Sequence, residues 1–263
     1  QTLPWQLSRL VPITAYQFSL SMRFDAPSTG VNIGTYLPVN SQRQRVLQES
    51  VQASQLKQLI FPSEHGLLSR WSGGGQAQSI HYQALIHGEP TRYTLSPHIE
   101  LPRYSPVLAN GVGQEWQAYL GESEDIPVNH PEIEALWQQI KPDDSSVVLS
   151  VLRSIYDYTA GLEALPFKGT TDSLTAMRLG AASCNGKSRL FVSLARLNGL
   201  PSRLVGGIIL TEGQKKSSHQ WVEVNVADQW VPFDPTNGYF AEIPSHYLEL
   251  YRGDNALFSH TSN

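Results

Sequence analysis

Residues 180–203 read GAASCNGKSRLFVSLARLNGLPSR, and this stretch decides the fold. Small residues precede Cys184, and an apolar stripe with helical spacing follows it, made of Leu190, Phe191, Leu194 and Leu197. Asn198-Gly199 is a typical helix stop, and Pro201 blocks continuation. The pattern predicts a helix from about Cys184 to Leu197 that carries the only cysteine of the chain near its N-terminus.

The hydrophobic period changes after this helix. Residues 203–210 form an apolar run, residues 220–226 alternate between apolar and polar, and residues 229–233 form a short strand that Pro235 closes. Residues 213–218 are polar and are expected to form a hairpin loop between the first two strands. The sequence therefore predicts antiparallel strands here.

Two further helices are predicted upstream. The segment Asn129-His130-Pro131-Glu132 is typical of a helix start with Asn129 as the cap, and Pro142 ends that helix. Its apolar stripe is Ile133, Leu136, Trp137 and Ile140. Asp144 or Ser145 is expected to cap the next helix, which stops at Gly161 and has a core face of Val148, Val151, Leu152, Ile155 and Tyr158. Helices followed by antiparallel strands indicate an α+β fold.

The first part of the chain has a different character. Residues 16–24 and 78–87 alternate in the manner of half-buried strands, residues 71–75 are expected to form a turn, and residues 46–61 fit either a strand or a helix. Prolines and glycines between Pro97 and Gly113 predict a linker. We therefore expect a small antiparallel β-sandwich domain over residues 1–112 and an α+β domain over residues 113–263.

Composition narrows the function classes. The 263 residues carry 19 basic and 23 acidic side chains, a formal net charge of −4, so a nucleic-acid partner is not expected. The hydrophobic content of 40% supplies a sizeable core. One cysteine excludes an intramolecular disulfide and a cysteine-based zinc cluster. Because the chain begins with Gln1, we expect it to be a processed or excised fragment.

Three side chains together suggest nucleophilic catalysis. Cys184 starts a helix, His219 opens a strand, and Asp234 ends the next strand. Each alone is ordinary, being typical of a buried thiol, a surface imidazole and a turn residue. A thiol at a helix N-terminus, however, is favoured as the thiolate, a histidine can take its proton, and an acid can orient that histidine. Neighbouring antiparallel strands would place His219 and Asp234 side by side.

Three blocks of the sequence resemble the core of the transglutaminase-like superfamily over about residues 130–245. They are the Cys184 helix with its Gly-Leu-Pro-Ser-Arg end, residues 218–224 (SHQWVEV) and residues 230–236 (WVPFDPT). The resemblance implies a papain-like α+β domain in which Cys184 is the nucleophile, His219 the base and Asp234 the orienting acid. The expected activity is attack on an amide or peptide carbonyl through a thioester, resolved by water or by an amine.

A narrower resemblance covers the whole chain. It is similar to the periplasmic part of bacterial membrane proteins that join a transglutaminase-like domain to seven transmembrane helices. This implies a periplasmic soluble domain of an inner-membrane protein, attached to the membrane through segments outside this chain. That family is often described as inactive, so the alternative is a catalytically silent module that binds or senses peptides. Its genes often neighbour those of ATP-grasp peptide ligases and retropepsin-like proteases, which are implied as functional partners.

The residues around the three candidate catalytic side chains also have predicted roles. Trp221 and Trp230 are predicted to pack behind the three residues, and Trp221 and Tyr239 are also candidates for substrate contact. The stretch before Cys184 departs from the family pattern because it lacks an obvious oxyanion donor, which leaves Thr170, Thr171, Thr175, Arg178 or the backbone N–H of Cys184. The second departure is the pair Asn185-Gly186. His81 and His87 share a strand face without a third ligand, so neither a metal nor another cofactor is expected.

Overall fold

The computed structural model describes residues 14–24, 30–53, 55–74, 78–102, 114–166, 171–213 and 218–262. The first part of the chain is built of strands: β1 (Thr14–Phe24), β2 (Val31–Leu37), β3 (Gln44–Ala53), β4 (Lys57–Ser63), β5 (Gly66–Gly73), β6 (Gln78–Gly88) and β7 (Thr91–Arg92). The second part opens with helices: α1 (Gln114–Leu120), α2 (Pro131–Ile140), α3 (Val148–Gly161), α4 (Ser173–Leu179) and α5 (Cys184–Leu197). The short strands β8 (Glu163–Ala164) and β9 (Ala181–Ala182) lie among these helices.

The last part of the chain returns to strands: β10 (Ser202–Ile209), β11 (His219–Val226), β12 (Gln229–Asp234), β13 (Tyr239–Phe240), β14 (Glu242–Ile243), β15 (Tyr247–Arg252) and β16 (Phe258–Ser262). This order confirms the predicted α+β class with a β-rich region ahead of the helices. Among the described helices, none combines the length and the apolar character that crossing a bilayer requires.

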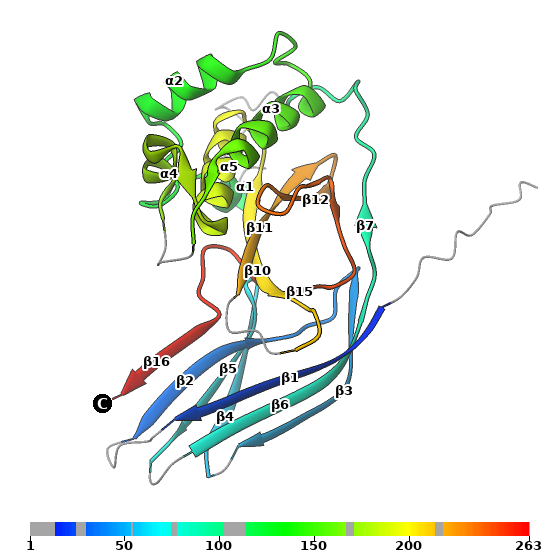
Figure 1. The fold of residues 1–263 in the computed structure, drawn as a ribbon, viewed down its shortest axis with the longest axis vertical. Coiled ribbons are helices and arrows are strands. Elements are labelled where there is room, and N and C mark those ends of the chain that lie inside the picture. Colours follow the sequence, from blue (N-terminus) through cyan, green and yellow to red (C-terminus); the bar gives the residue numbers. More distant parts are fainter. Residues whose placement is uncertain are drawn as a thin grey trace, which may run out of the picture.

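One large sheet runs through the molecule. Its strands follow the order β13-β12-β11-β10-β15-β5-β2-β16, with β4 paired to β5, while β1, β6 and β3 form a separate antiparallel sheet. Figure 1 shows the helices gathered around β10–β12 at one end and the strands β1–β6 at the other. Strands β15 and β16, from the end of the chain, pair with β5 and β2 of the first part. The sheet therefore continues across the expected division at residues 112 and 113.

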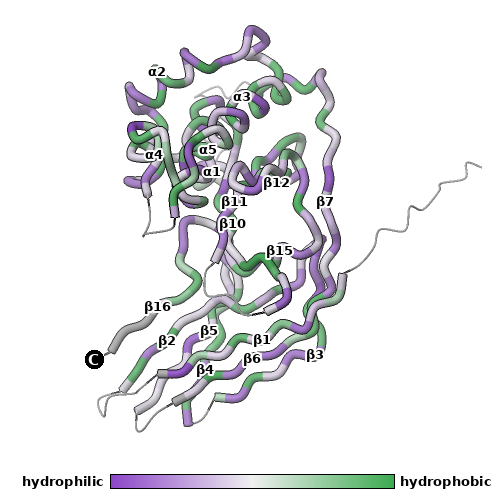
Figure 2. The backbone as a smooth tube through the Cα atoms, in the orientation of Figure 1, coloured by the Kyte–Doolittle hydropathy of each residue, from purple (hydrophilic) through white to green (hydrophobic). Residues whose placement is uncertain are grey.

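Two apolar cores fill the molecule. Helix α5 packs against β10 and β11, and helices α2 and α3 pack against α5. Ile133, Leu152 and Phe191 of these three helices are all 0% exposed in this core. The second core lies between the three-stranded sheet and β2, β5 and β15, and it contains Ile80, Tyr82 and Trp71. Figure 2 shows hydrophilic and hydrophobic residues alternating along β1 and β6, which is the alternation expected for strands buried on one face.

Several local predictions are confirmed and others are wrong. The predicted strands at residues 16–24 and 78–87 form β1 and β6, and the ambiguous residues 46–61 form parts of β3 and β4. The turn predicted at residues 71–75 is wrong for its first residues, because Trp71 lies in β5 and is fully buried in the second core. Gly75, residues 103–113 of the expected linker and residues 214–217 of the expected loop lie outside the described residues.

The helix predictions differ from the structure at the caps. Helix α2 begins at Pro131, and its cap is His130 instead of the expected Asn129; Nδ1 of His130 accepts from the backbone N–H of Glu132 at 3.2 Å. Helix α3 begins at Val148, and its cap is Val147 instead of the expected Asp144 or Ser145. The residues before it form a turn, in which the backbone N–H of Val147 donates to the carbonyl of Asp144 and the Ser146 hydroxyl donates to the Asp144 carboxylate.

Candidate active site

Helix α5 begins at the cysteine. Cys184 is its first residue and follows Ser183, whose extended backbone (φ −79°, ψ −177°) brings the chain into the helix. The N–H groups of a first helical turn have no partner within the helix, and the helix dipole is positive at this end. The Cys184 thiol is only partly buried. It therefore occupies a position that favours a negative charge and that a ligand can reach.

Gly186 explains how the first turn of α5 packs. A side chain at this position would place its Cβ 2.8 Å from the Cβ of Ala182 and 3.2 Å from the Cβ of Thr171. The first distance is shorter than real Cβ atoms show and the second is tight, so the absence of a side chain lets this turn lie against both residues. The pair Asn185-Gly186, which departs from the family pattern, is thus accommodated by close packing beside Cys184.

The strand pair β11–β12 brings His219 and Asp234 together. His219 is the first residue of β11 and Asp234 the last residue of β12, in an antiparallel register that pairs Val222 with Phe233. Nε2 of His219 lies 2.7 Å from Oδ2 of Asp234, and the carboxylate is fully buried. This bond occupies Nε2, so Nδ1 is the ring nitrogen left to face the thiol.

The Asp234 carboxylate is surrounded by donors. The hydroxyl of Tyr247 donates to Oδ2 at 2.6 Å, and Nδ2 of Asn237 donates to the same oxygen at 3.2 Å. The backbone N–H groups of Thr236 and Asn237 donate to Oδ1 at 2.9 and 3.3 Å. Burial raises the pKa of Asp234, but the hydrogen bond and the charge of His219 together with these donors outweigh it and hold the pKa below its ordinary value. The carboxylate is therefore ionised in the folded protein.

The thiol and the imidazole shift each other in opposite directions. Burial raises the pKa of the Cys184 thiol, but its hydrogen bond to His219 and the imidazole charge lower it more, with a further contribution from the backbone N–H of Gln220. Burial lowers the pKa of His219, whereas its bonds to Asp234 and Cys184 raise it to about 9. The arrangement thus favours a thiolate next to an imidazolium at neutral pH.

Aromatic side chains support the imidazole. Trp221 lies with its ring centroid 6.1 Å from that of His219 in a stacked arrangement and is 1% exposed. Tyr247 contacts both rings edge-on. Trp221 therefore packs behind His219 as expected, but its burial leaves no surface for the predicted substrate contact. Tyr239 stays half-buried beside Asp234, with its ring against Tyr247 at 5.7 Å.

Trp230 does not pack behind these residues, so that prediction is wrong. Its ring contacts Trp116 and Tyr119 at 6.1 and 5.0 Å, and the Arg203 guanidinium lies 3.9 Å from its centroid. Trp230 lies four positions from Asp234 along the strand, so it belongs to the opposite end of β12. Arg203 also pairs with Glu223 at 2.9 Å.

The side-chain oxyanion donors expected from the sequence are engaged elsewhere or are not described. Thr175 donates its hydroxyl to Asp172 at 2.6 Å, and Arg178 pairs with Glu132 on the surface. Thr170 lies outside the described residues. The Thr171 side chain packs against Gly186. The backbone N–H of Cys184, in the first turn of α5, remains as a donor from that set.

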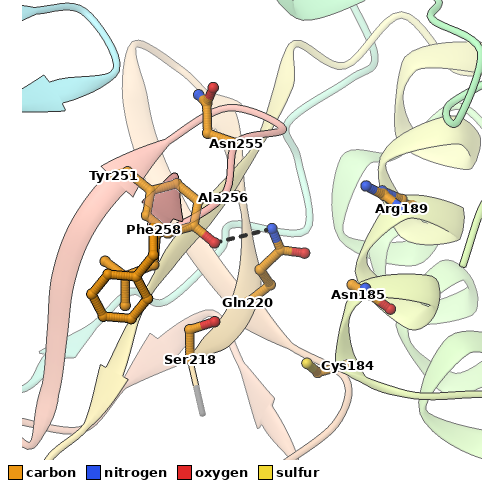
Figure 3. A pocket seen from close by; sticks show the side chains of 10 residues that line it. Cys184, Asn185, Arg189, Ser218, Gln220, Tyr251, Asn255, Ala256 and Phe258 are labelled. Atoms are coloured by element: carbon orange, nitrogen blue, oxygen red, sulfur yellow. Dashed lines mark hydrogen bonds between the residues drawn. The ribbon is translucent and has the colours of Figure 1, made fainter. Parts of the chain in front are cut away.

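Sequence reasoning missed Tyr247, Asn237 and Gln220. Asn237 lies three residues after Asp234, in a turn that an Asp-Pro-Thr-Asn-Gly sequence favours, so its closeness was detectable. Tyr247 comes from β15, and no local pattern links it to Asp234. Gln220 follows His219 and points to the other face of β11, into a cavity that also contains Cys184. Figure 3 shows this cavity, with Cys184 on one side and Tyr251 on the other.

A metal site is not formed by the described side chains. Within the described ranges, no cluster of three or more histidine, cysteine, aspartate or glutamate residues is placed to hold an ion. His81, one of the two histidines considered for zinc, bonds instead to the Ser21 hydroxyl at 2.7 Å.

Comparison with known proteins agrees with this geometry. Residues 135–235 match the family model of the transglutaminase-like superfamily core, and this segment contains Cys184, His219 and Asp234. The segment is a transglutaminase-like domain. None of the curated proteins compared with the chain matches it.

Solved structures share the fold. A protein from Cytophaga hutchinsonii, named as a candidate cysteine protease, superposes with a TM-score of 0.73 at 16% identity over 96% of this chain and 87% of its own. At this identity the likeness establishes the fold. The periplasmic domain of TgpA from Pseudomonas aeruginosa aligns with a TM-score of 0.39 at 14% identity over 84% of this chain and 70% of its own.

Proposed function

We propose that the protein is a cysteine hydrolase or acyltransferase that acts on amide or peptide bonds. Cys184, His219 and Asp234 are proposed to work as a catalytic triad. The observation that carries the proposal is the chain of contacts from a thiol at a helix N-terminus, through an imidazole whose pKa is raised to about 9, to a fully buried carboxylate. A pKa inversion of this kind is typical of an activated nucleophile rather than of a structural thiol.

The first half of the proposed reaction forms a thioester. The Cys184 thiolate attacks the carbonyl carbon, and the carbonyl oxygen takes the negative charge, which the Cys184 backbone N–H stabilises. As the tetrahedral intermediate collapses, the C–N bond breaks and the His219 imidazolium gives its proton to the departing nitrogen. The products are an amine and a thioester on Cys184. Asp234 keeps the imidazole oriented throughout, because its carboxylate is itself held by Tyr247 and Asn237.

The second half regenerates the thiolate. Neutral His219 takes a proton from water or from an acceptor amine, whose lone pair attacks the thioester carbonyl. The C–S bond then breaks, and the product is a carboxylic acid or a new amide. The partly exposed thiol is compatible with either acceptor.

The pH dependence of Cys184 alkylation tests this proposal. Iodoacetamide reacts with the thiolate, and the chain has one cysteine, so the rate reports on this residue alone. We expect an inflection below the ordinary value of about 8.5 in the native protein. In His219→Ala the positive partner is lost while burial remains, so the inflection should rise. The rate at pH 7 should then fall at least about tenfold, because each pKa unit changes the thiolate fraction tenfold.

His98→Ala is the matched control, since His98 is exposed and far from the site in the sequence. It should leave the profile unchanged. An inert thiol, or the same ordinary inflection in the native protein and in His219→Ala, would refute the triad. The alternative of a silent peptide-binding module would then be tested by screening peptides for binding.

We also propose that the protein acts in the periplasm as the soluble domain of an inner-membrane protein, on peptide-like substrates. The support is the likeness of the sequence to periplasmic domains joined to transmembrane helices. Fractionation of cells that express the full-length natural protein, followed by protease accessibility of this domain from the periplasmic side, tests the placement. Recovery of the domain in a protected cytoplasmic location would contradict it.

A further inference from the structure

A cavity of about 240 Å³ lies beside the Cys184 thiol. It is bounded by the start of α5, by β11 and by the segment that joins β15 to β16, and its walls include Asn255, Leu257 and Phe258. Cavities that hold a whole drug-sized ligand measure roughly 300–1,000 Å³, so this one suits a group about the size of one residue. Figure 3 shows Gln220 and Arg189 facing each other across it.

The Gln220 side chain has one satisfied end and one unsatisfied end. Its Nε2 donates to the Tyr251 hydroxyl at 3.3 Å, while its buried Oε1 has no hydrogen-bond partner. The residue is only 8% exposed. A buried amide oxygen without a partner costs free energy, so its presence on a cavity wall points to a donor supplied by a ligand.

Tyr251 fixes the orientation of this amide. A Cβ at Gly206 would lie 1.9 Å from Cζ of Tyr251, so the tyrosine ring rests directly on the backbone of β10. The ring cannot tilt toward β10, and its hydroxyl is held beside Gln220. The Oε1 of Gln220 consequently remains directed away from Tyr251.

Arg189 presents the complementary unsatisfied group. Its Nη1 donates to the backbone carbonyl of Thr171 at 3.1 Å and its Nη2 to Asp254 at 2.7 Å, but its buried Nε has no partner. Arg189 is 4% exposed. The Arg189 charge is offset by two carboxylates, because Asp125 and Asp254 lie 3.4 and 2.7 Å from Nη2. An anionic ligand is therefore not needed to neutralise it.

We propose that this cavity is a substrate subsite that binds a secondary amide next to the attacked carbonyl. The amide N–H donates to Oε1 of Gln220, and the amide C=O accepts from Nε of Arg189. A neutral peptide group is the substrate feature that carries one such donor and one such acceptor. Leu257 and Phe258 contact the apolar group attached to it. The proposal rests on the proposed function and makes Gln220 a specificity-determining residue.

Two reagents test the role of the N–H. N-benzoylglycine chloromethyl ketone alkylates a thiolate by forming an S–C bond with loss of chloride, and its ester counterpart, with oxygen in place of the amide nitrogen, does the same without the N–H. The ratio of their second-order rates cancels any change in the thiol itself. We expect a ratio of about ten or more in the native protein, the size of one hydrogen bond.

Variants assign the ratio to Gln220. Gln220→Met keeps the size of the side chain but removes the acceptor, so the ratio should fall to near one. Gln220→Glu keeps an acceptor and should retain a ratio well above that of Gln220→Met. Gln138→Met, on the exposed face of α2, should keep the native ratio.

The outcomes separate this proposal from the proposed function. Suppose that the native protein reacts rapidly with iodoacetamide at pH 6 but shows a reagent ratio near one. The proposed function of Cys184 as a nucleophile would then stand, and the proposed subsite would be refuted. A ratio that survives in Gln220→Met also overturns it. A thiol with ordinary reactivity toward iodoacetamide defeats the proposed function itself.

Discussion

At the scale of single residues, Asp234 holds the site together. Its carboxylate is fully buried and faces His219, Tyr247 and Asn237. A buried carboxylate is costly unless donors compensate for the lost water; His219 contributes most to that compensation, and the 2.6 Å bond from Tyr247 adds to it. Tyr247 thus acts on the candidate site through Asp234 rather than by contact with the thiol.

Tyr247→Phe should lower the free energy of unfolding by about 1.5–3 kcal/mol at pH 7, the size of a hydrogen bond to a charged group. The lowered pKa of Asp234 means that its stabilisation is present above the ordinary value of 3.8 and is lost as pH falls through the native pKa. The substitution raises the pKa of Asp234 in the folded protein, so the loss of unfolding free energy relative to the native protein should become smaller below pH 3.8. Urea unfolding of both proteins at several pH values measures this difference.

The matched control is Tyr158→Phe, because Tyr158 lies on α3, half-buried and apart from Asp234. A Tyr247→Phe deficit that is the same at every pH would show that the hydroxyl does not act through the carboxylate.

At the scale of secondary-structure elements, helix α5 sets the position of the nucleophile. Its residues from Asn185 to Ala195 are buried between the other helices and the sheet. The first turn approaches Ala182 and Thr171 so closely that only glycine fits at position 186. The thiol is thus placed by packing around the helix, and not by a side-chain cap, since Ser183 makes no such bond.

Gly186→Ala should destabilise the protein by about 1–3 kcal/mol, because the added methyl group overpacks this contact. It should also slow iodoacetamide alkylation, since a shift of the first turn disturbs the contact between Cys184 and His219. Gly161→Ala is the matched control: no atom lies within 4 Å of the added Cβ, and alanine in a helix is favoured by about 0.4–1 kcal/mol. Thermal unfolding of both variants, with alkylation rates, tests the contrast. Equal stability of the two variants would contradict the packing argument.

At the scale of the whole molecule, the first part of the chain supports the strand that carries Tyr247. Gln44 of β3 bonds in both directions to the backbone of Glu249 in β15, with its Nε2 and Oε1 each 2.9 Å from their partners. Arg43 donates to the backbone carbonyl of Tyr247 at 2.6 Å. Contacts more than 200 positions apart in sequence therefore lead from the β-rich region to Asp234.

Gln44→Leu should destabilise the protein by more than about 2 kcal/mol, because it leaves two buried backbone groups of Glu249 unpaired. Amide hydrogen exchange should accelerate in β15, including Tyr247. The control is Gln52→Leu, an exposed position on the same strand. Unchanged exchange in β15 with Gln44→Leu would show that the β-rich region does not support this strand.

The sequence by itself determined the elements whose residues are close along the chain. The stripe after Cys184 predicted α5 with its correct bounds, and the alternating run after His219 predicted β11. Periodicity predicts them because burial of one face imposes a spacing of about 3.6 in a helix and 2 in a strand. The sequence also predicted that His219 and Asp234 lie side by side, because a short hairpin between two strands allows only a few pairing registers.

Only the tertiary structure decided what joins the site to the rest of the molecule. Tyr247, Gln44 and the unsatisfied amide of Gln220 have neighbours set by strand order, and no local pattern encodes which distant strands become neighbours in a sheet. The helix caps also differed: His130 rather than Asn129 caps α2, and Val147, which makes no side-chain bond, precedes α3. Trp230 does not contact the candidate site, because it lies near the start of β12 beside Tyr119, whereas Asp234 lies at the end of β12 beside His219.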